Sequence, residues 1–156
     1  MSGTIYICAS GKRQNLETPT SLHYQKLLSG YFKVSVDYIP PPHCPKGAQE
    51  RIVTLECEQL VAHWPSPSAY GVALSEEGKL FTSHQFSQWI KTKITGQSSI
   101  VFNIGGAYGL SPEFKKKCRE TISLSPMTFS HTMCMTMLME QLYRAFTILH
   151  THPYHK

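Results

Sequence analysis

Two periods of hydrophobic and polar positions follow one another along the chain, and their alternation predicts strands that alternate with helices. Short apolar or alternating segments predict five strands at 4–9, 34–39, 70–74, 99–104 and 121–124. Apolar residues at helical spacing predict helices that begin near Thr18 and Thr82 and others that cover 48–63, 112–119 and 132–150. This order indicates one α/β domain over residues 1–156, with a mostly parallel sheet and helices on both faces.

The last of these helices carries more apolar side chains than one buried face requires. Its main apolar stripe consists of Leu138, Leu142, Ala145 and Leu149. Further apolar side chains are supplied by Met133, Met135, Met137 and Met139. A second apolar face on a helix of this kind indicates a homodimer.

Composition narrows the class of protein. Hydrophobic residues make up 41% of the chain and charged residues 16%, which is too apolar for a disordered chain and too interrupted for a membrane span. The first residues form neither a basic region nor a long apolar run, so we expect a cytoplasmic protein without a secretory signal. The five cysteines are scattered without a Cys-x-x-Cys pair, which favours reduced thiols over a zinc or redox site.

A glycine-rich segment follows the fourth expected strand. The residues 104–110 read Ile-Gly-Gly-Ala-Tyr-Gly-Leu and lie where open α/β sheets bind ligands, and glycine there allows a ligand to approach the backbone closely. The spacing matches neither the Gly-x-Gly-x-x-Gly of dinucleotide folds nor a phosphate-binding loop, so neither NAD nor ATP is favoured. A plain tight turn explains the segment at least as well.

A second candidate ligand segment, 124–131, lies between the last expected strand and the last helix. Its Pro126 restricts the chain, and Met127 and Phe129 offer apolar contact to an uncharged ring or a thioether. A turn followed by a helix cap explains the same residues nearly as well.

The tail 150–156 concentrates histidines, which raises a small-ligand enzyme with a metal site as one hypothesis. We expect no metal, because no cysteine or carboxylate lies nearby in the sequence. A solvated terminus is the ordinary alternative. A third possibility is that Tyr154, His155 and Lys156 stack on an RNA base and contact its phosphate.

The positive charge of the chain also favours an RNA partner. The net charge of +5 favours a polyanion such as RNA, although a modest excess is common among unrelated proteins. The run Lys115–Lys117, joined by Arg119, is either a solvated helix face or a surface that contacts RNA. Arg144 lies amid apolar neighbours and needs an anionic partner, for which Glu140 is a candidate.

Four segments together resemble one family. They read Gly-Gly-x-x-Gly-Leu-Ser at 105–111, Leu-Ser-x-Met-Thr-Phe-x-His at 124–131, Glu-Gln-Leu-Tyr-Arg-Ala-Phe at 140–146 and Pro-Tyr-His-Lys at 153–156. In order and spacing they resemble the ribosomal RNA large subunit methyltransferase H family, and the match extends upstream through 72–79. The resemblance implies S-adenosylmethionine-dependent methylation of N3 of a pseudouridine in 23S rRNA. The sequence leaves open whether free rRNA, the large subunit or the assembled ribosome is the substrate, and we expect the assembled ribosome.

This family belongs to the knotted SPOUT class, so the resemblance implies a homodimer and a C-terminal trefoil knot, which residue patterns alone would not predict. By the same resemblance, S-adenosylmethionine contacts Leu74, Gly105, Leu124, Ser125, Pro126, Met127, Thr128 and Phe129. The RNA side maps onto His131, Arg144, Tyr154 and His155, with the tail of one subunit completing the site of the other. We expect His155 to take the N3 proton and Arg144 to stabilise the imide anion.

Three positions depart from the family pattern. Ser75 replaces an acidic residue, Ser130 a proline and Met135 an arginine. The lost charge at Met135 would weaken rRNA binding unless Lys115–Lys117 compensate. These departures motivate an alternative function, a non-catalytic ribosome- or RNA-binding module that retains the fold, which would fail to bind S-adenosylmethionine in calorimetry.

Overall fold

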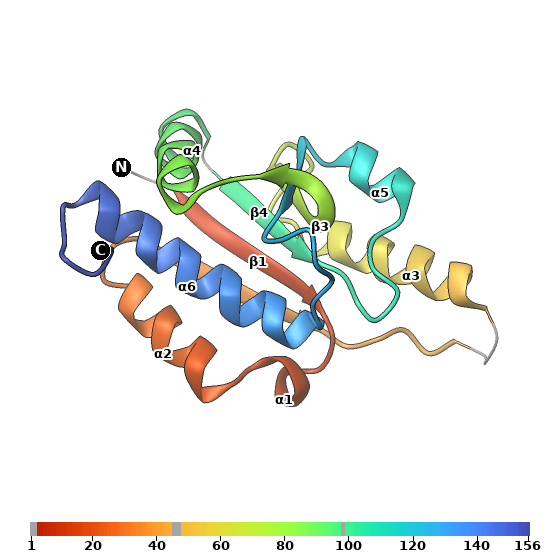
Figure 1. Cartoon of the computed structure of the whole chain (residues 1–156). Helices are drawn as coiled ribbons and strands as arrows, with labels where there is room; N and C mark the ends of the chain where they lie inside the picture. Colours follow the sequence, from red (N-terminus) through yellow and green to blue (C-terminus); the bar gives the residue numbers. More distant parts are fainter. Residues whose placement is uncertain (1–2, 45–47, 98) are drawn as a thin grey trace.

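The computed structural model describes residues 3–44, 48–97 and 99–156, in which strands and helices alternate along the chain (Figure 1). The strands are β1 (Thr4–Ser10), β2 (Val34–Ile39), β3 (Tyr70–Leu80), β4 (Ser99–Ile104) and β5 (Glu120–Ser123). The helices are α1 (Arg13–Leu16), α2 (Pro19–Leu28), α3 (Gln49–Ala62), α4 (Ser83–Gly96), α5 (Pro112–Lys117) and α6 (His131–Leu149). Every expected strand and helix is present, and the boundaries agree to within about two residues except in β3.

The five strands form one sheet in the order β2-β1-β4-β3-β5, and each neighbouring pair is parallel. Parallel strands expose their carboxyl ends at one edge of the sheet, so the loops that follow β4 and β5 meet there, beside the residues of β3 that follow Leu74. The predicted parallel α/β fold is therefore confirmed.

Both faces of the sheet are covered by helices, as the alternation along β1 requires. Ile5 and Ile7 are fully buried on one face, with residues of α2, α4 and α6. Cys8 points to the other face, where it packs in a second core with residues of α3 and α5. Helix α6 lies between α2 and α4 on the first face, against both of which it packs (Figure 1). The apolar face of α6 therefore belongs to the main core.

Strand β3 is longer than the expected 70–74 and has a break in its pairing. Leu74 pairs with Ile122 of β5, and the pairing resumes between Lys79 and the same residue. Between them, a Cβ added to Gly78 would lie 2.6 Å from the backbone carbon of Ile122, so only glycine fits there. The polar residues of the break concealed this extension from the hydrophobic pattern. The predicted knot stays a prediction.

Local capping agrees with the sequence in two helices. Thr82 and Gln85 form the expected capping box of α4, with backbone to side-chain distances of 3.1 and 2.9 Å. Thr18 caps α2, where Ser21 completes the box. The four-residue helix α1 was not expected, because a single helical turn leaves no apolar period to detect.

Two of the departures from the family pattern have structural explanations. Ser130 caps α6, since its side chain accepts a hydrogen bond of 3.3 Å from the Met133 amide. Met135 is fully buried in the main core, so the position faces the core in this chain and offers no surface for RNA. The expectation that the charge missing at Met135 weakens rRNA binding stays a prediction.

All five cysteines are free thiols. Within the described ranges, no helix has both the length and the hydropathy needed to span a membrane.

Candidate functional site

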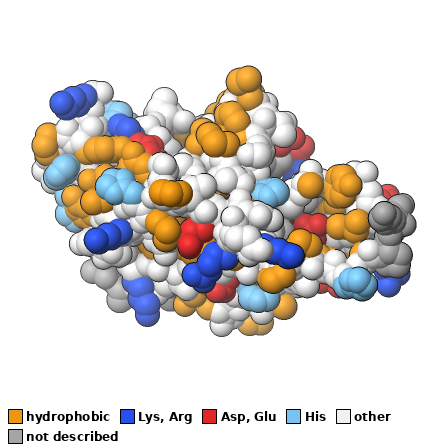
Figure 2. All heavy atoms as spheres, turned by 90° about the horizontal axis from the view of Figure 1, so that it is seen from below, with side chains coloured by type: hydrophobic (Ala, Val, Ile, Leu, Met, Phe, Trp, Pro, Cys, Tyr) orange, Lys and Arg blue, Asp and Glu red, His pale blue; other side chains and the backbone are white. Residues whose placement is uncertain are grey.

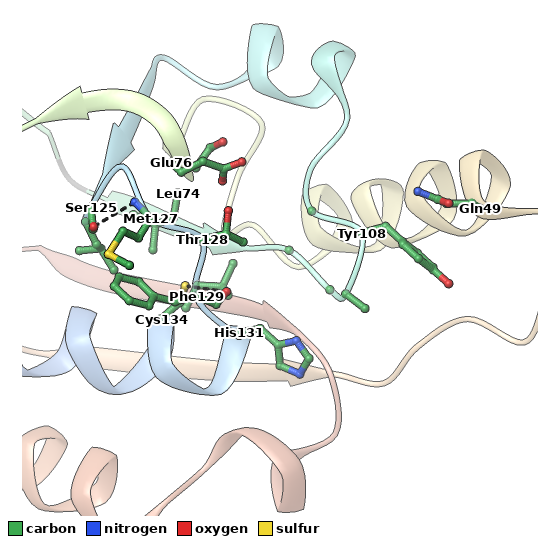
Figure 3. Close-up of a pocket in the computed structure, with 17 residues that line it drawn as sticks. Gln49, Leu74, Glu76, Tyr108, Ser125, Met127, Thr128, Phe129, His131 and Cys134 are labelled. Carbon is green, nitrogen blue, oxygen red and sulfur yellow. Dashed lines mark hydrogen bonds between the residues drawn. The ribbon is translucent and has the colours of Figure 1, made fainter.

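A cavity of about 390 Å³ lies at the carboxyl edge of the sheet (Figure 3), within the usual range for small-molecule sites. Its walls come from the break within β3, from the loops after β4 and β5, and from the first residues of α3 and α6. Seven of the eight residues predicted to hold the methyl donor line it, namely Leu74, Gly105, Leu124, Ser125, Met127, Thr128 and Phe129. The cavity lining includes His131 but not Pro126.

The glycine loop after β4 forms one wall and is tightly closed. The amide of Gly109 donates a hydrogen bond of 3.0 Å to the carbonyl of Gly106, and Gly109 has a φ of 76°, a value that favours glycine. A Cβ on Gly105 would lie 2.8 Å from the backbone carbon of Gly109. The loop is therefore a tight turn, which was the alternative to a ligand-binding loop, and it also forms a wall of the cavity.

The opposite wall is the segment 124–129, which is held in shape by serine side chains. Ser123 Oγ donates to the carbonyl of Ser125 at 2.7 Å, and the amide of Met127 donates to Ser125 Oγ at 3.1 Å. This turn leaves Met127 71% exposed at the rim. Phe129 lines the cavity (Figure 3), so the segment offers the apolar contacts expected from its sequence.

The buried carboxylate of Glu56 packs against the backbone of the glycine loop, a contact that the sequence analysis did not predict. Glu56 of α3 is only 7% exposed, and a Cβ on Gly106 would collide with its carboxylate. Burial raises the pKa of Glu56, while a hydrogen bond from the Gly106 backbone partly opposes the rise. The sequence feature that indicates its burial is its position within the apolar stripe of Val53, Cys57 and Leu60.

Replacing Glu56 by glutamine is expected to stabilise the protein at neutral pH. The folded-state pKa of Glu56 is raised, so its contribution to stability is complete below the unfolded pKa and is lost as pH rises through the folded pKa. Glutamine keeps an oxygen for Gly106 without the charge. We expect the Tm at pH 7 to rise by about 2–4 °C, the change that corresponds to about 1 kcal/mol, and the gain to vanish near pH 4. Thermal unfolding monitored by circular dichroism measures both, and an equal gain at both pH values contradicts the assignment.

A second cluster of predicted residues lies near the other end of α6. Arg144 Nε donates to Glu140 Oε1 at 3.0 Å, and Tyr154 Oη donates to the same oxygen at 2.9 Å. The other side of the Arg144 guanidinium lies 3.0 Å from His155 Nδ1. The expected pairing of Arg144 with Glu140 is confirmed, and Arg144, Tyr154 and His155 are brought together as predicted.

Neighbouring rings fix the tail in this cluster. The Arg144 guanidinium lies 4.6 Å from the centre of the Tyr154 ring, and Tyr24 Oη of α2 lies 3.1 Å from Tyr154 Oη. The rings of His84 and His155 meet edge to face at 4.8 Å. Tyr154 and His155 therefore hold the tail against α2, α4 and α6.

The charges in this cluster are matched. The pKa of Arg144 is raised, chiefly by its hydrogen bond to Glu140. Burial raises the pKa of Tyr154 well above that of a free phenol, and hydrogen bonds to Tyr24 and Glu140 add to the effect. Tyr154 is therefore a neutral phenol at neutral pH, and it donates its one O–H to Glu140.

Within one chain, the two groups of predicted residues are far apart. His131 begins α6, and Arg144 lies 13 residues further along the same helix, a separation of about 20 Å at 1.5 Å per residue. His131 therefore belongs to the cavity, whereas Arg144, Tyr154 and His155 lie away from it.

The basic run on α5 contributes less free charge than its sequence suggests. Lys115 Nζ is 2.6 Å from Glu77 Oε1 in the break of β3, so this charge is matched within the chain. Lys116, Lys117 and Arg119 are exposed. Among the described residues, no group of three or more histidine, cysteine, aspartate or glutamate side chains is arranged to hold a metal ion.

Comparison with known proteins points to one family. The model of the family described as predicted SPOUT methyltransferase matches residues 1–155. The ribosomal RNA large subunit methyltransferase H of Wolinella succinogenes is 36% identical over 154 residues, covering 96% of each chain. The protein of the same name from Parabacteroides distasonis is 40% identical over 133 residues, covering 85% of each.

Solved structures share the fold at low sequence identity. A probable methylase family protein from Haemophilus influenzae Rd KW20 has a TM-score of 0.54 and 14% identity, covering 98% of this chain and 70% of its own. A probable methyltransferase from Bordetella pertussis Tohama I also has a TM-score of 0.54, with 12% identity and coverage of 93% and 96%.

Proposed function

Because the chain belongs to the SPOUT methyltransferase family and, within it, to the ribosomal RNA large subunit methyltransferases H, we propose that it methylates N3 of a pseudouridine in 23S rRNA. S-adenosylmethionine is the methyl donor, and the assembled ribosome in the cytoplasm is the substrate. The observation that carries the proposal is the cavity at the carboxyl edge of the sheet, lined by seven of the eight residues expected to hold the donor.

The residues of the cavity fit this donor. Leu74 and Phe129 offer apolar surface to the adenine, and Gly105 allows a close approach to the backbone. The cavity also contains one carboxylate, that of Glu76, which suits a positively charged ligand. When bound, S-adenosylmethionine supplies a methyl group already activated by a sulfonium, so the protein mainly has to position the two reactants.

The separation of the two groups of residues along α6 supports a homodimer. Because Arg144 lies about 20 Å from the start of the helix that carries His131, we infer that the cluster of one subunit completes the cavity of its partner. Exposed apolar side chains are available for such an interface, among them Met133 at 49% and Leu80 at 53%. Figure 2 shows hydrophobic side chains gathered, with histidine between them, on the side where Figure 1 places the C-terminus.

The cluster is suited to stabilising an imide anion. N3 of pseudouridine lies between two carbonyl groups, and loss of its proton places negative charge on their oxygens. Arg144 is held by Glu140 with its guanidinium toward His155, so its remaining N–H groups can donate to such an oxygen. Tyr154 contributes indirectly: its raised pKa keeps the phenol protonated, and its one O–H is donated to Glu140, the carboxylate that positions Arg144.

The contact between Arg144 and His155 determines which ring nitrogen of a neutral His155 carries the proton. A guanidinium only donates, so Nδ1 of His155 accepts in this contact, and a neutral His155 carries its proton on Nε2. In this arrangement His155 donates through Nε2. Taking the N3 proton, the role we propose for His155, therefore requires that Nδ1 separates from Arg144 when RNA binds.

To test the proposal, the protein is incubated with S-adenosylmethionine that carries a labelled methyl group. The substrates compared are 70S ribosomes, separated subunits and free 23S rRNA, all of which lack the modification. We expect label in one pseudouridine of the large-subunit rRNA, with 70S ribosomes as the best substrate. Mass spectrometry of nuclease fragments locates the methyl group. Transfer to uridine as readily as to pseudouridine contradicts the specificity, and absence of S-adenosylmethionine binding favours the non-catalytic alternative.

A further inference from the structure

One charged side chain faces the cavity. Among the described residues that line it, Glu76 is the single aspartate, glutamate, lysine or arginine. It follows Leu74 and Ser75 in the break of β3, and Figure 3 shows it at the edge of the cavity on the side away from His131. Its neighbour Glu77 pairs instead with Lys115 of α5 and does not line the cavity.

The charge of Glu76 acts across the cavity. Cys134 of α6 lines the same cavity. Burial raises the pKa of its thiol, and the negative charge of Glu76 raises it further. Two walls contributed by different parts of the chain are thus electrostatically coupled, and any charge bound between them lies in the field of Glu76.

We propose that Glu76 makes this cavity select the positively charged methyl donor over its uncharged product. The inference rests on the proposed function. On transfer, N3 of the pseudouridine, whose proton passes to His155, forms a bond to the methyl carbon. The bond between that carbon and sulfur breaks, its electron pair stays on sulfur, and the sulfonium becomes a neutral thioether. Donor and product are otherwise the same molecule. A carboxylate on the cavity wall therefore attracts the donor more strongly than it attracts the product. This difference in affinity favours the exchange of bound product for a new molecule of donor.

The test compares Glu76→Gln with the matched control Glu77→Gln, by calorimetry on the full chain at low ionic strength. Each variant removes one carboxylate, and the two positions are adjacent in the sequence. We expect the ratio of the Kd for S-adenosylhomocysteine to the Kd for S-adenosylmethionine to fall about fivefold in Glu76→Gln, the size expected for two charges in a partly solvated cavity. The loss lies in the donor's affinity, and Glu77→Gln keeps the ratio of the unmodified protein.

A third ligand distinguishes the effect of the positive charge on affinity from the effect of the methyl group. Sinefungin carries an amine in place of the methylated sulfonium, so it is cationic without being a donor. It should lose affinity in Glu76→Gln as S-adenosylmethionine does. A ratio that is unchanged in Glu76→Gln, or sinefungin that follows the neutral product, overturns the selection by Glu76 while leaving the proposed function intact. Failure of the unmodified protein to bind any of the three overturns the proposed function itself.

Discussion

Replacing Arg144 by alanine is expected to lower kcat for methyl transfer to ribosomes about 100- to 1000-fold, the loss typical when one donor to a developing oxyanion is removed. The guanidinium of Arg144 is held by Glu140 and lies against the Tyr154 ring, so it is already placed before RNA binds. Because the cavity is on another part of the chain, the Kd for S-adenosylmethionine should not change. Single-turnover methylation and calorimetry measure the two quantities separately.

Lys117→Ala is the control for this prediction, since it removes an exposed positive charge from α5. It should leave kcat within about twofold and act only on KM, through weaker attraction to the phosphates. Arg144→Ala also leaves the half-buried carboxylate of Glu140 without its ion pair, at a cost of about 1–3 kcal/mol, so Tm is recorded for both variants. A kcat for Arg144→Ala close to that of the control is incompatible with a role for Arg144 in charge stabilisation.

The fold was largely readable from the sequence because the strands of a parallel sheet are covered on both faces. Their apolar runs are therefore nearly continuous, as in β4, and the helices between them have clear stripes and caps. The extension of β3 was not readable. Its residues after Leu74 are polar, and they pair with β5 again only because Gly78 fits against the Ile122 backbone, a close approach that depends on tertiary structure.

The site was predicted in part for a similar reason. Segments that form a loop by themselves, such as 124–129, carry their signal locally, and their residues do line the cavity. Contacts between distant parts of the chain carry no such signal. Tyr24 and Tyr154 are 130 residues apart and share a hydrogen bond, and Glu56 supports Gly106 from a separate helix. Neither Tyr24 nor Glu56 lies in a sequence motif that indicates its distant partner.

The separation between the cavity and the Arg144 cluster leads to the second large effect. Gly105→Ala is expected to abolish donor binding, because its Cβ would lie 2.8 Å from the Gly109 backbone and the loop would have to move. Arg144→Ala is expected to inactivate the cluster and spare the cavity. In the proposed homodimer, each variant should therefore be nearly inactive, for different reasons, and circular dichroism and gel filtration test whether both variants remain folded and dimeric.

A heterodimer of these two variants, purified through different tags on each subunit, should regain about half of the unmodified activity, because a two-fold dimer has two sites and one of them is then intact. That site combines the cavity of the Arg144→Ala subunit with the cluster of the Gly105→Ala subunit. A dimer of one unmodified chain and one double variant provides the mirror control and should be inactive, since each of its sites carries one defect. If every site instead belonged to a single chain, the first heterodimer would stay inactive and the second would keep about half of the activity. The pair of measurements thus decides whether the cluster acts on its own cavity or on that of the partner subunit.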